Sequence, residues 1–564
     1  MLGSSVAKLL AVAAAAAASG LGQSIFAAAQ MCSNASTAID GTPFPPLIEA
    51  TLEDLVAGLE KGLFTSVDLV NTYIARIMEV NSTLHMVAEL NPDALTIAAQ
   101  LDGQRKCGKT KGPLHGIPIL IKNNIATDDK MNNTAGSYAL LGSKVPEDST
   151  MAAKLRKAGA IILGKTNLSQ WANYRSSNSS NGWSAYGGQT KGAYYPDQDP
   201  SGSSSGSGVA SSLGLALAAL GTETSGSILS PSNQNNLVGI KPTVGLTSRY
   251  LVIPISEHQD TIGPMARTVK DAAYLLSAIA GEDTKDNYTS AIPFDTVPKY
   301  EEACDFFALK GKRIGVPRNM MNIGTAAYRA PILTAFNDAL KIMKKAGATI
   351  VDDLNITGYD LYRTASNTGV VLQADFISDL RNYVSELTYN PNGITDVASL
   401  RAFTQSFPAE EYPTRNTATW DSALALHYDN TAPEFWSNYT RNLLYAGPWG
   451  ITGALANYSL DALVLPTIFS PGLPALIGAP VVTVPLGAYP PNTTVIQNSI
   501  GTLNSTAPNI PYGISFLGKH FDEYNLIGYA YAFEQRTMVR DTIVPYIQPA
   551  TELKDVVTKR KMKL

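Results

Sequence analysis

The sequence predicts an α/β fold in which helices and strands alternate around a layered core. Two pairs of segments carry this prediction: a helix-like segment is followed directly by a short apolar run at 151–158 and 160–163, and again at 328–346 and 348–351. The composition agrees, because a chain of 564 residues with 45% hydrophobic and 16% charged side chains can bury a large core. We find no internal repeat and no linker that forces a domain break.

The remaining elements follow from local patterns along the chain. Helices are expected at 51–63, which begins with a Thr-x-x-Asp start, and at 66–80, where apolar residues recur at helical spacing. The run 117–121 (Ile-Pro-Ile-Leu-Ile) is typical of a buried strand. A helix of small residues is expected at 207–220, after a loop-like stretch at 183–208. Further strands are expected at 312–316, 463–466 and 480–485, a late helix at 523–535, and a helical insertion at about 353–442.

The first 29 residues have the outline of a secretory signal peptide. Lys8 precedes an Ala-rich apolar run at 9–18, and a small-x-small cleavage site ends at Ala29. An uncleaved anchor is the alternative, but the stretch 9–29 is broken by Gly and Gln and is mostly Ala, which gains little on transfer into a bilayer. The pattern predicts a secreted, extracellular protein, cleaved after Ala29 and without stable membrane association.

The chain after this signal peptide (1–29) is expected to form one large domain. A polar leader at 30–46 precedes a single domain at 47–550, and a basic C-terminal tail at 551–564 is expected to be a solvated end. The net charge is -4, and the sequence has no long run of charges of one sign. Both observations argue against a nucleic-acid partner. No pattern indicates the oligomeric state.

Two further features bear on export. Asn-x-Ser/Thr sequons are dense enough to favour a secreted glycoprotein. The three cysteines, Cys32, Cys107 and Cys304, leave at least one unpaired within the chain, and their pairing cannot be deduced. None of them has metal-ligand spacing, so we expect neither a metal nor an organic cofactor. The sequons begin at Asn34, Asn81, Asn132, Asn178, Asn287, Asn355, Asn438, Asn457, Asn492 and Asn504.

The densest chemical signal is a pair of Gly- and Ser-rich stretches at 201–208 and 221–228. A flexible linker is a poor interpretation, because an apolar run at 213–220 follows the first stretch at once. A phosphate or dinucleotide loop would need a further glycine or a G-K-[ST] sequence. The segment 202–206 formally matches the G-x-S-x-G nucleophile elbow, but no strand precedes it and no Asp and His follow in a supporting context.

In this pattern the chain resembles the amidase signature family. The resemblance extends from about 47 to 543, and several ordered motifs at consistent spacing are far more specific than any one of them. The matching segments are 115–123 (HGIPILIKN), 164–169 (GKTNLS), 202–204 (GSS), 221–228 (GTETSGSI), 238–243 (VGIKPT), 263–267 (GPMAR), 478–485 (GAPVVTVP) and 521–523 (FDE).

The resemblance implies a fold and a reaction. It implies a large mixed central β-sheet covered by helices on both faces, and a Ser-Ser-Lys triad. By motif, Ser227 attacks the amide carbonyl, Ser203, held in a cis peptide, passes its proton on, and Lys122 is the base. The chemistry is reasonable, because a serine hydroxyl needs a neighbouring base and a lysine is a base only when burial lowers its pKa from about 10.4. The apolar run before Lys122 offers such a setting.

The glycines around the nucleophile have a purpose as well. The backbone N–H groups of Thr224, Ser225, Gly226 and Ser227 could converge on the developing oxyanion, where one donor is worth roughly 3–4 kcal/mol. The family usually has Gly or Asp where this chain has Ser225, and commonly Gly where it has Ser205. The backbone role of these positions survives both changes.

Two lesser candidates flank the motifs. Asn173 resembles an asparagine that contacts the substrate backbone in bacterial peptide amidases of this family, although a loop asparagine that caps a turn is an equally plain interpretation. His115 lies beside the lysine strand, and a structural role is the better expectation for it.

The leading functional prediction is a secreted hydrolase of small carboxamides or C-terminally amidated peptides, which needs no cofactor. An esterase or carbamate hydrolase on the same triad is one alternative, and a secreted non-catalytic binding protein on an amidase scaffold is another. The amidotransferase subunit of the same family needs an intracellular complex, which the signal peptide argues against. The natural substrate and the specificity of its acyl and leaving groups are not readable from the sequence.

Overall fold

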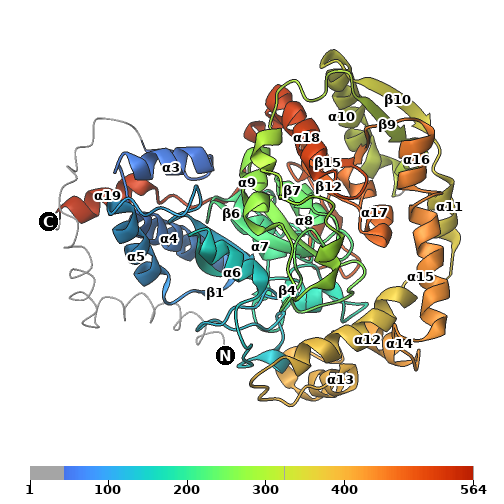
Figure 1. The fold of residues 1–564 in the computed structure, drawn as a ribbon, viewed down its shortest axis with the longest axis horizontal. Coiled ribbons are helices and arrows are strands. Elements are labelled where there is room, and N and C mark those ends of the chain that lie inside the picture. Colours follow the sequence, from blue (N-terminus) through green and yellow to red (C-terminus); the bar gives the residue numbers. More distant parts are fainter. Residues whose placement is uncertain (1–43, 323, 367, 563–564) are drawn as a thin grey trace.

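One large mixed sheet forms the centre of the molecule (Figure 1). The structure is a computed structural model that describes residues 44–562, except 323 and 367. The predicted signal peptide and nearly all of the polar leader lie outside the described residues. The sheet has eleven strands in the order β1 (Val87–Leu90), β3 (Ile161–Thr166), β2 (Pro118–Lys122), β6 (Ala218–Glu223), β8 (Thr261–Ala266), β7 (Val238–Lys241), β12 (Val481–Ala488), β15 (Pro511–Leu517), β11 (Ala462–Pro466), β9 (Arg313–Pro317) and β10 (Thr349–Leu354).

The sheet combines parallel and antiparallel pairs. Strand β2 runs parallel to β3 and β6, and β9 runs parallel to β10 and β11, whereas the pairs from β6 through β8, β7, β12 and β15 to β11 are antiparallel. Two short ribbons lie outside it: β4 (Trp183–Ser184) with β5 (Gly188–Gln189), and β13 (Ile496–Gln497) with β14 (Asn504–Thr506).

Helices pack against this sheet and complete the α/β architecture that the sequence predicts. Helices α7 and α8 contact each other and the central strands, and α9 and α18 form a second contacting pair. The helices are α3 (Leu52–Glu60), α4 (Ser66–Leu84), α5 (Ala94–Lys106), α6 (Thr150–Lys157), α7 (Ser205–Ser212), α8 (Leu229–Gln234), α9 (Val269–Ile279), α10 (Ala326–Lys345), α11 (Thr357–Thr364), α12 (Val370–Ser385), α13 (Val397–Ser406), α14 (Ala418–Leu424), α15 (Pro433–Ala446), α16 (Ile451–Asn457), α17 (Gly472–Ile477), α18 (Glu523–Thr537) and α19 (Leu553–Met562).

Most expected elements lie within a few residues of their positions in the structure. The expected strand at 117–121 corresponds to β2, the expected helix at 328–346 corresponds to α10, and the expected late helix corresponds to α18. The Thr-x-x-Asp start is a capping box in α3, and Thr65 and Asp68 form a second one at α4. The segment from 353 to 442 holds α11 to α14 and most of α15, which curve along the lower right of the molecule in Figure 1.

The helix expected at 207–220 is wrong after Ser212. Gly214 adopts a left-handed φ of +60°, and a Cβ there would lie 2.3 Å from the carbonyl oxygen of Leu47. The chain then enters β6, a fully buried strand between β2 and β8. A run of Leu and Ala has helical propensity, but tertiary pairing overrides propensity where the segment is buried on all sides.

The C-terminal tail also differs from the solvated end that we expected. Residues 553–562 form α19, which packs on α4. Leu553 and Val557, four residues apart on one face of the helix, are fully buried, and Arg560 forms an ion pair with Asp68 at 2.5 Å. No helix in the described ranges is both long enough and apolar enough to span a bilayer.

Candidate active site

Lys122, the predicted base, lies at the end of β2 with no exposed surface. Its Nζ atom lies 2.8 Å from Oγ of Ser203, 2.8 Å from Oγ1 of Thr222 and 3.2 Å from the Thr222 carbonyl oxygen. A neutral amine has two N–H donors and one lone pair, so it can donate twice to Thr222 and accept the Ser203 proton. The three contacts therefore suit a lysine that works as a base.

The surroundings of Lys122 favour its neutral form. Burial disfavours the ammonium ion and lowers the pKa of Lys122 to about 7, while the carboxylates of Asp260 and Glu223 oppose that shift. A substantial share of the side chain is then neutral near physiological pH. The apolar strand that precedes it supplies the low-dielectric setting that the sequence suggested.

Ser203, the predicted relay, follows a cis peptide bond between Gly202 and Ser203. The next residue, Ser204, donates its backbone N–H to the carbonyl oxygen of Ser227 at 3.2 Å and its hydroxyl to the Thr222 carbonyl at 3.1 Å. These bonds bring the stretch at the start of α7 against the stretch that follows β6. The structure thus joins Lys122 to Ser203 directly, and places the backbone of Ser227 beside that of Ser204.

A glycine in α7 permits this close approach. A Cβ added to Gly206 would lie 2.2 Å from the Met86 carbonyl oxygen and 2.5 Å from that of Asn167, which are distances that real Cβ atoms do not show. The backbone N–H of Gly206 also donates to the Asn167 carbonyl at 3.0 Å. The Gly- and Ser-rich composition therefore reflects dense packing of α7 against the sheet.

The loop that carries Ser227 is shaped by Glu223, a residue whose role the sequence did not indicate. One oxygen of its buried carboxylate accepts the backbone N–H of Gly226 at 2.7 Å, and the other accepts those of Ile228 and Leu229 at 2.7 and 2.9 Å. Three backbone donors on one carboxylate fix the path of the loop into α8. Glu223 lies inside the 221–228 motif, and this placement was the only signal for it.

The four-donor oxyanion hole that we predicted needs correction at Gly226. Its N–H is already bonded to Glu223, so it is not directed at a substrate oxygen. The backbone N–H groups of Thr224, Ser225 and Ser227 have no hydrogen-bond partner within residues 44–562 as described. Three candidate donors therefore remain beside the predicted nucleophile, and Ser225 is exposed while Thr224 and Ser227 are largely buried.

Asn173, the predicted substrate-contacting residue, lies next to this site. Its Nδ2 atom donates to Oδ1 of Asn181 at 3.0 Å and would lie 2.9 Å from a Cβ built on Gly202. Trp171, Ala172 and Asn173 all have φ between +51° and +68°, a conformation that side chains other than glycine rarely adopt. Packing of the neighbouring rings stabilises this backbone conformation: the Trp171 ring contacts the Trp420 ring of α14 edge-on, with 5.8 Å between the ring centroids.

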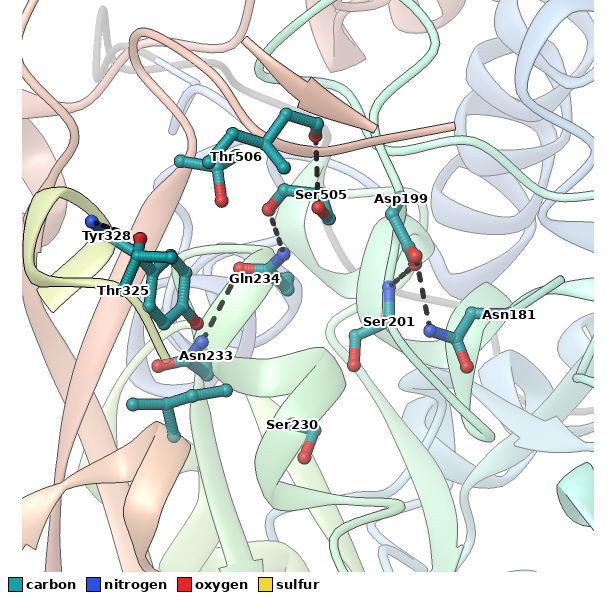
Figure 2. A pocket seen from close by; sticks show the side chains of 12 residues that line it. Asn181, Asp199, Ser201, Ser230, Asn233, Gln234, Thr325, Tyr328, Ser505 and Thr506 are labelled. Atoms are coloured by element: carbon teal, nitrogen blue, oxygen red, sulfur yellow. Dashed lines mark hydrogen bonds between the residues drawn. The ribbon is translucent and has the colours of Figure 1, made fainter. Parts of the chain in front are cut away.

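A cavity of about 360 Å³ adjoins these residues (Figure 2). Asn181 and Ser201 come from the segments beside Asn173 and Ser203, and Ser230 follows the nucleophile loop. Asp199, nearly fully buried, accepts the N–H of Ser201 at 2.8 Å and Nδ2 of Asn181 at 3.2 Å. Polar groups thus line the part of the cavity wall that these four residues form. The rest of the wall is formed by Asn233, Gln234, Thr325, Tyr328, Ile468, Ile496, Ser505 and Thr506.

His115, the other sequence candidate, has structural contacts. Its Nε2 atom lies 2.9 Å from the Leu101 carbonyl oxygen, and its Nδ1 atom accepts the Lys111 N–H at 3.3 Å. Burial lowers the pKa of this imidazole, which keeps it neutral. Both ring nitrogens are occupied in holding the turn that leads into β2.

Comparison with known proteins places the chain in a family. The family model described as Amidase matches residues 68–527. A putative amidase from the fungus Arthroderma benhamiae is 56% identical over 91% of this chain and 89% of its own length. A probable amidase from Arabidopsis thaliana is 38% identical over 87% of this chain and 91% of its own.

Solved structures agree with this placement. The native peptide amidase from Stenotrophomonas maltophilia superposes with a TM-score of 0.78 at 37% identity, covering 90% of this chain and 100% of that one. A peptide amidase in complex with the competitive inhibitor chymostatin superposes with a TM-score of 0.77 at 38% identity, covering 87% and 98%. The large mixed sheet and its helices are those of an amidase signature enzyme. This chain belongs to the amidase signature family, and it is an amidase, a hydrolase of carbon–nitrogen bonds.

Proposed function

We propose that the chain is a secreted amidase that releases ammonia from C-terminal peptide amides through an acyl-enzyme on Ser227. The observation that carries the catalytic part is the contact between Lys122 and Ser203, which puts a buried base with a lowered pKa against a serine hydroxyl. Ser203 in turn leads into the segment that hydrogen-bonds the backbone of Ser227.

The reaction has two halves that share one proton path. In the first, Lys122 takes the proton of Ser203, Ser203 takes that of Ser227, and the Ser227 oxygen attacks the amide carbonyl carbon. The carbon–nitrogen bond breaks as the relay returns the proton to the leaving nitrogen, which departs as ammonia. In the second, water attacks the acyl-enzyme and gives a proton to the same relay, which returns it to the Ser227 oxygen as the ester bond breaks and the free acid leaves.

Backbone donors stabilise the charge that forms on the carbonyl oxygen. The N–H groups of Thr224, Ser225 and Ser227 are the donors that Glu223 leaves free. Fixed donors in a partly buried site need no reorganisation during the reaction, and one of them is worth roughly 3–4 kcal/mol in the barrier. Glu223 contributes indirectly, since it holds the loop that presents these groups.

Two observations support a peptide substrate. The cavity beside Ser201 and Ser230 offers amide, hydroxyl and carboxylate groups that suit the hydrogen-bonding groups of a peptide backbone, with Tyr328 and Ile468 available to an apolar side chain. Asn173 lies beside this cavity and reaches its wall through Asn181. The 37–38% identity to peptide amidases over most of both chains supports the same class of substrate.

Secretion is supported by the N-terminal pattern and by the sequons. Within the described residues, the asparagines of four sequons are exposed: Asn287, Asn355, Asn457 and Asn492. Expression of the full chain in a eukaryotic host tests this part. We expect mature protein in the medium that begins at Gln30 and loses mass when treated with a peptide N-glycosidase. Retention of an intact N-terminus inside the cells would contradict it.

The enzymatic part is tested by ammonia release from a panel of C-terminally amidated peptides. We expect the mature protein to convert them to free acids and Ser227→Ala to lose this activity by at least about 10³-fold. Ser211→Ala is a matched control, because Ser211 is a buried serine of α7 whose hydroxyl has no partner among the described residues. Equal turnover by Ser227→Ala and wild type would reject the assignment.

A further inference from the structure

A second carboxylate, that of Asp260, also contacts the nucleophile loop. Asp260 is half-buried and immediately precedes β8. One of its oxygens accepts the Thr224 hydroxyl at 2.5 Å, and the other accepts the backbone N–H groups of Ile255 and Ser256 at 2.7 and 3.1 Å. All three partners are donors, so they bind the ionised form of the carboxylate.

We propose that Asp260 is a positioning residue of the amidase site, which holds Thr224 and thereby the free N–H donors of residues 224 and 225 in place for the substrate oxygen. This inference rests on the proposed function of Ser227 and extends it to a residue that does not touch the substrate. Glu223 fixes the loop after these donors, at Gly226, whereas Asp260 holds it at Thr224, the first of them. The donors are thus held between two carboxylates.

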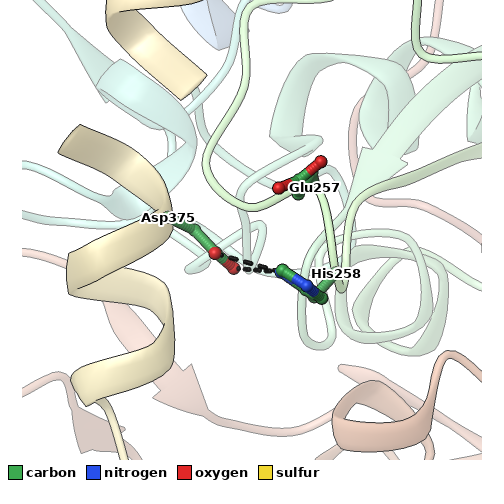
Figure 3. A group of neighbouring side chains, drawn as sticks. All are labelled: Glu257, His258 and Asp375. Atoms are coloured by element: carbon green, nitrogen blue, oxygen red, sulfur yellow. Dashed lines mark hydrogen bonds and ion pairs between the residues drawn. The ribbon is translucent and has the colours of Figure 1, made fainter. Parts of the chain in front are cut away.

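Asp260 is also linked by hydrogen bonds, through Ser256, to α12, which carries Asp375 (Figure 3). Ser256, whose N–H donates to Asp260, donates its hydroxyl to Asp375 of α12 at 2.5 Å. Asp375 also lies 3.0 Å from Nδ1 of His258 through each of its oxygens and accepts Nδ2 of Asn430 at 3.0 Å. A chain of hydrogen bonds therefore links α12 to the nucleophile loop through Ser256 and Asp260.

No metal ion is needed to explain why Glu257, His258 and Asp375 lie close together. Glu257, His258 and Asp375 each offer a ligand atom within 4.8 Å of the others. However, both oxygens of Asp375 already have hydrogen-bond partners, and Glu257 accepts Nδ2 of Asn430 at 2.8 Å. With both oxygens of Asp375 satisfied, the arrangement is that of a hydrogen-bonded His–Asp pair with its supporting hydrogen bonds.

Asp260 also acts on Lys122 by its charge. Its carboxylate raises the pKa of Lys122 against the larger effect of burial, and Glu223 contributes in the same direction. The other charged groups that line a cavity of about 290 Å³ together with Asp260 are Arg249, Glu257, Lys285, Asp286, Asp379 and Glu386. Loss of the Asp260 charge would leave Lys122 neutral at a lower pH.

The test follows phosphonylation of Ser227 by a fluorophosphonate as a function of pH, with the amidase rate measured in parallel. For Asp260→Asn we expect labelling to slow by about 10- to 100-fold, because Asn cannot accept all three donors, and the acidic limb to move to lower pH by about half a unit or more. Thr224→Val should slow labelling without moving the limb, and Thr224→Ser should restore it.

Asp271→Asn is the matched control, since Asp271 is a buried carboxylate that accepts the backbone N–H of Leu52 and is not among the charges that shift the pKa of Lys122. If Asp260→Asn resembles Asp271→Asn, with a lower Tm but an unmoved limb and an equal labelling rate, Asp260 is merely structural and the inference is overturned. Labelling of Ser227 without any amide turnover would instead reject the proposed function, while the two Asp260 readouts would still decide this inference. Absence of labelling in the wild type would overturn both.

Discussion

The Nζ atom of Lys122 lies 2.8 Å from Oγ of Ser203, and neither side chain has any exposed surface. Because burial lowers the pKa of Lys122 to about 7, the neutral base becomes the major form only above that pH. We therefore expect kcat/KM to rise with pH through an acidic limb near 7 and then to level off. A pH–rate profile between 5 and 9 with a peptide amide measures this.

Replacing the base should remove the limb together with the activity. Lys122→Met is expected to lower kcat by at least about 10²-fold, the smaller end of what a general base contributes. Lys165→Met is the matched control, since Lys165 is equally buried and its pKa is also lowered to about 7, but its Nζ donates to Asn133 and the Ile125 carbonyl instead. An acidic limb that moved in Lys165→Met would contradict the assignment of that limb to Lys122.

The buried lysines also predict how stability depends on pH. The folded-state pKa of Lys165 is about 7, against about 10.4 in an unfolded chain, so between these values the unfolded state binds the additional proton. The free energy of unfolding then rises with pH, by at most about 1.4 kcal/mol per pH unit for this lysine. Denaturant titrations at pH 7 to 10 should show a smaller slope for Lys165→Met than for wild type. Lys157→Met, on the exposed side of α6, should leave the slope unchanged.

Glu223 gives a prediction about the nucleophile loop. Glu223→Gln retains the shape of the side chain but replaces an acceptor oxygen by a donor, so one or two of its three backbone hydrogen bonds are lost. We expect kcat to fall by more than about 10-fold and unfolding to become easier by about 2–4 kcal/mol. Glu523→Gln, which loses one bond from the Thr243 N–H, should lower stability while kcat remains near wild type. Kinetics and chemical denaturation of both variants separate the two effects.

The buried ion pair between Arg175 and Glu410 is expected to hold the helical segment against the site. The pair lies at 3.0 Å, and Glu410 also accepts the Ser137 hydroxyl and the Tyr138 N–H. Glu410→Gln should lower the free energy of unfolding by about 3–5 kcal/mol, because it leaves the Arg175 charge buried without the carboxylate that pairs with it. The same change at an exposed pair, Asp338→Asn beside Lys341, should stay within about 0.5 kcal/mol. Similar losses of stability in Glu410→Gln and Asp338→Asn would show that the buried ion pair contributes no more to stability than an exposed one.

Asn173 should affect binding more than chemistry. For an amidated tripeptide, Asn173→Ala is expected to raise KM by about 10-fold and to change kcat little, because the lost contact is made equally before and during the reaction. A small aryl amide that does not reach the cavity should show no change. Equal effects on both substrates would place Asn173 in the support of the loop rather than at the substrate.

The sequence predicts those parts of the site that depend on local patterns. The strand before Lys122 is recognisable because Ile117 to Ile121 form an uninterrupted apolar run, and the two Gly- and Ser-rich stretches stand out by composition alone. The fold class follows from the alternation of helices and strands. These features depend on neighbours along the chain, which a single sequence displays.

The parts that the sequence does not predict depend on contacts between distant residues. Strand β6 resembles a helix locally, and only its pairing with β2 and β8 makes it a strand. The partners of Glu223 are backbone N–H groups, which no residue pattern encodes, so the loss of Gly226 as an oxyanion donor could not be foreseen. Asp260 lies 36 residues from Thr224, and nothing between them indicates that they meet.

The most direct test of the account identifies the residue that becomes acylated. Wild-type enzyme is mixed with an activated ester of a short peptide, quenched within the first turnover, digested, and mapped by mass spectrometry. We expect the acyl group on the peptide that contains Ser227, and its loss in Ser227→Ala but not in Ser211→Ala. An acyl group on any other residue, or turnover with no acylated serine at all, would contradict the account.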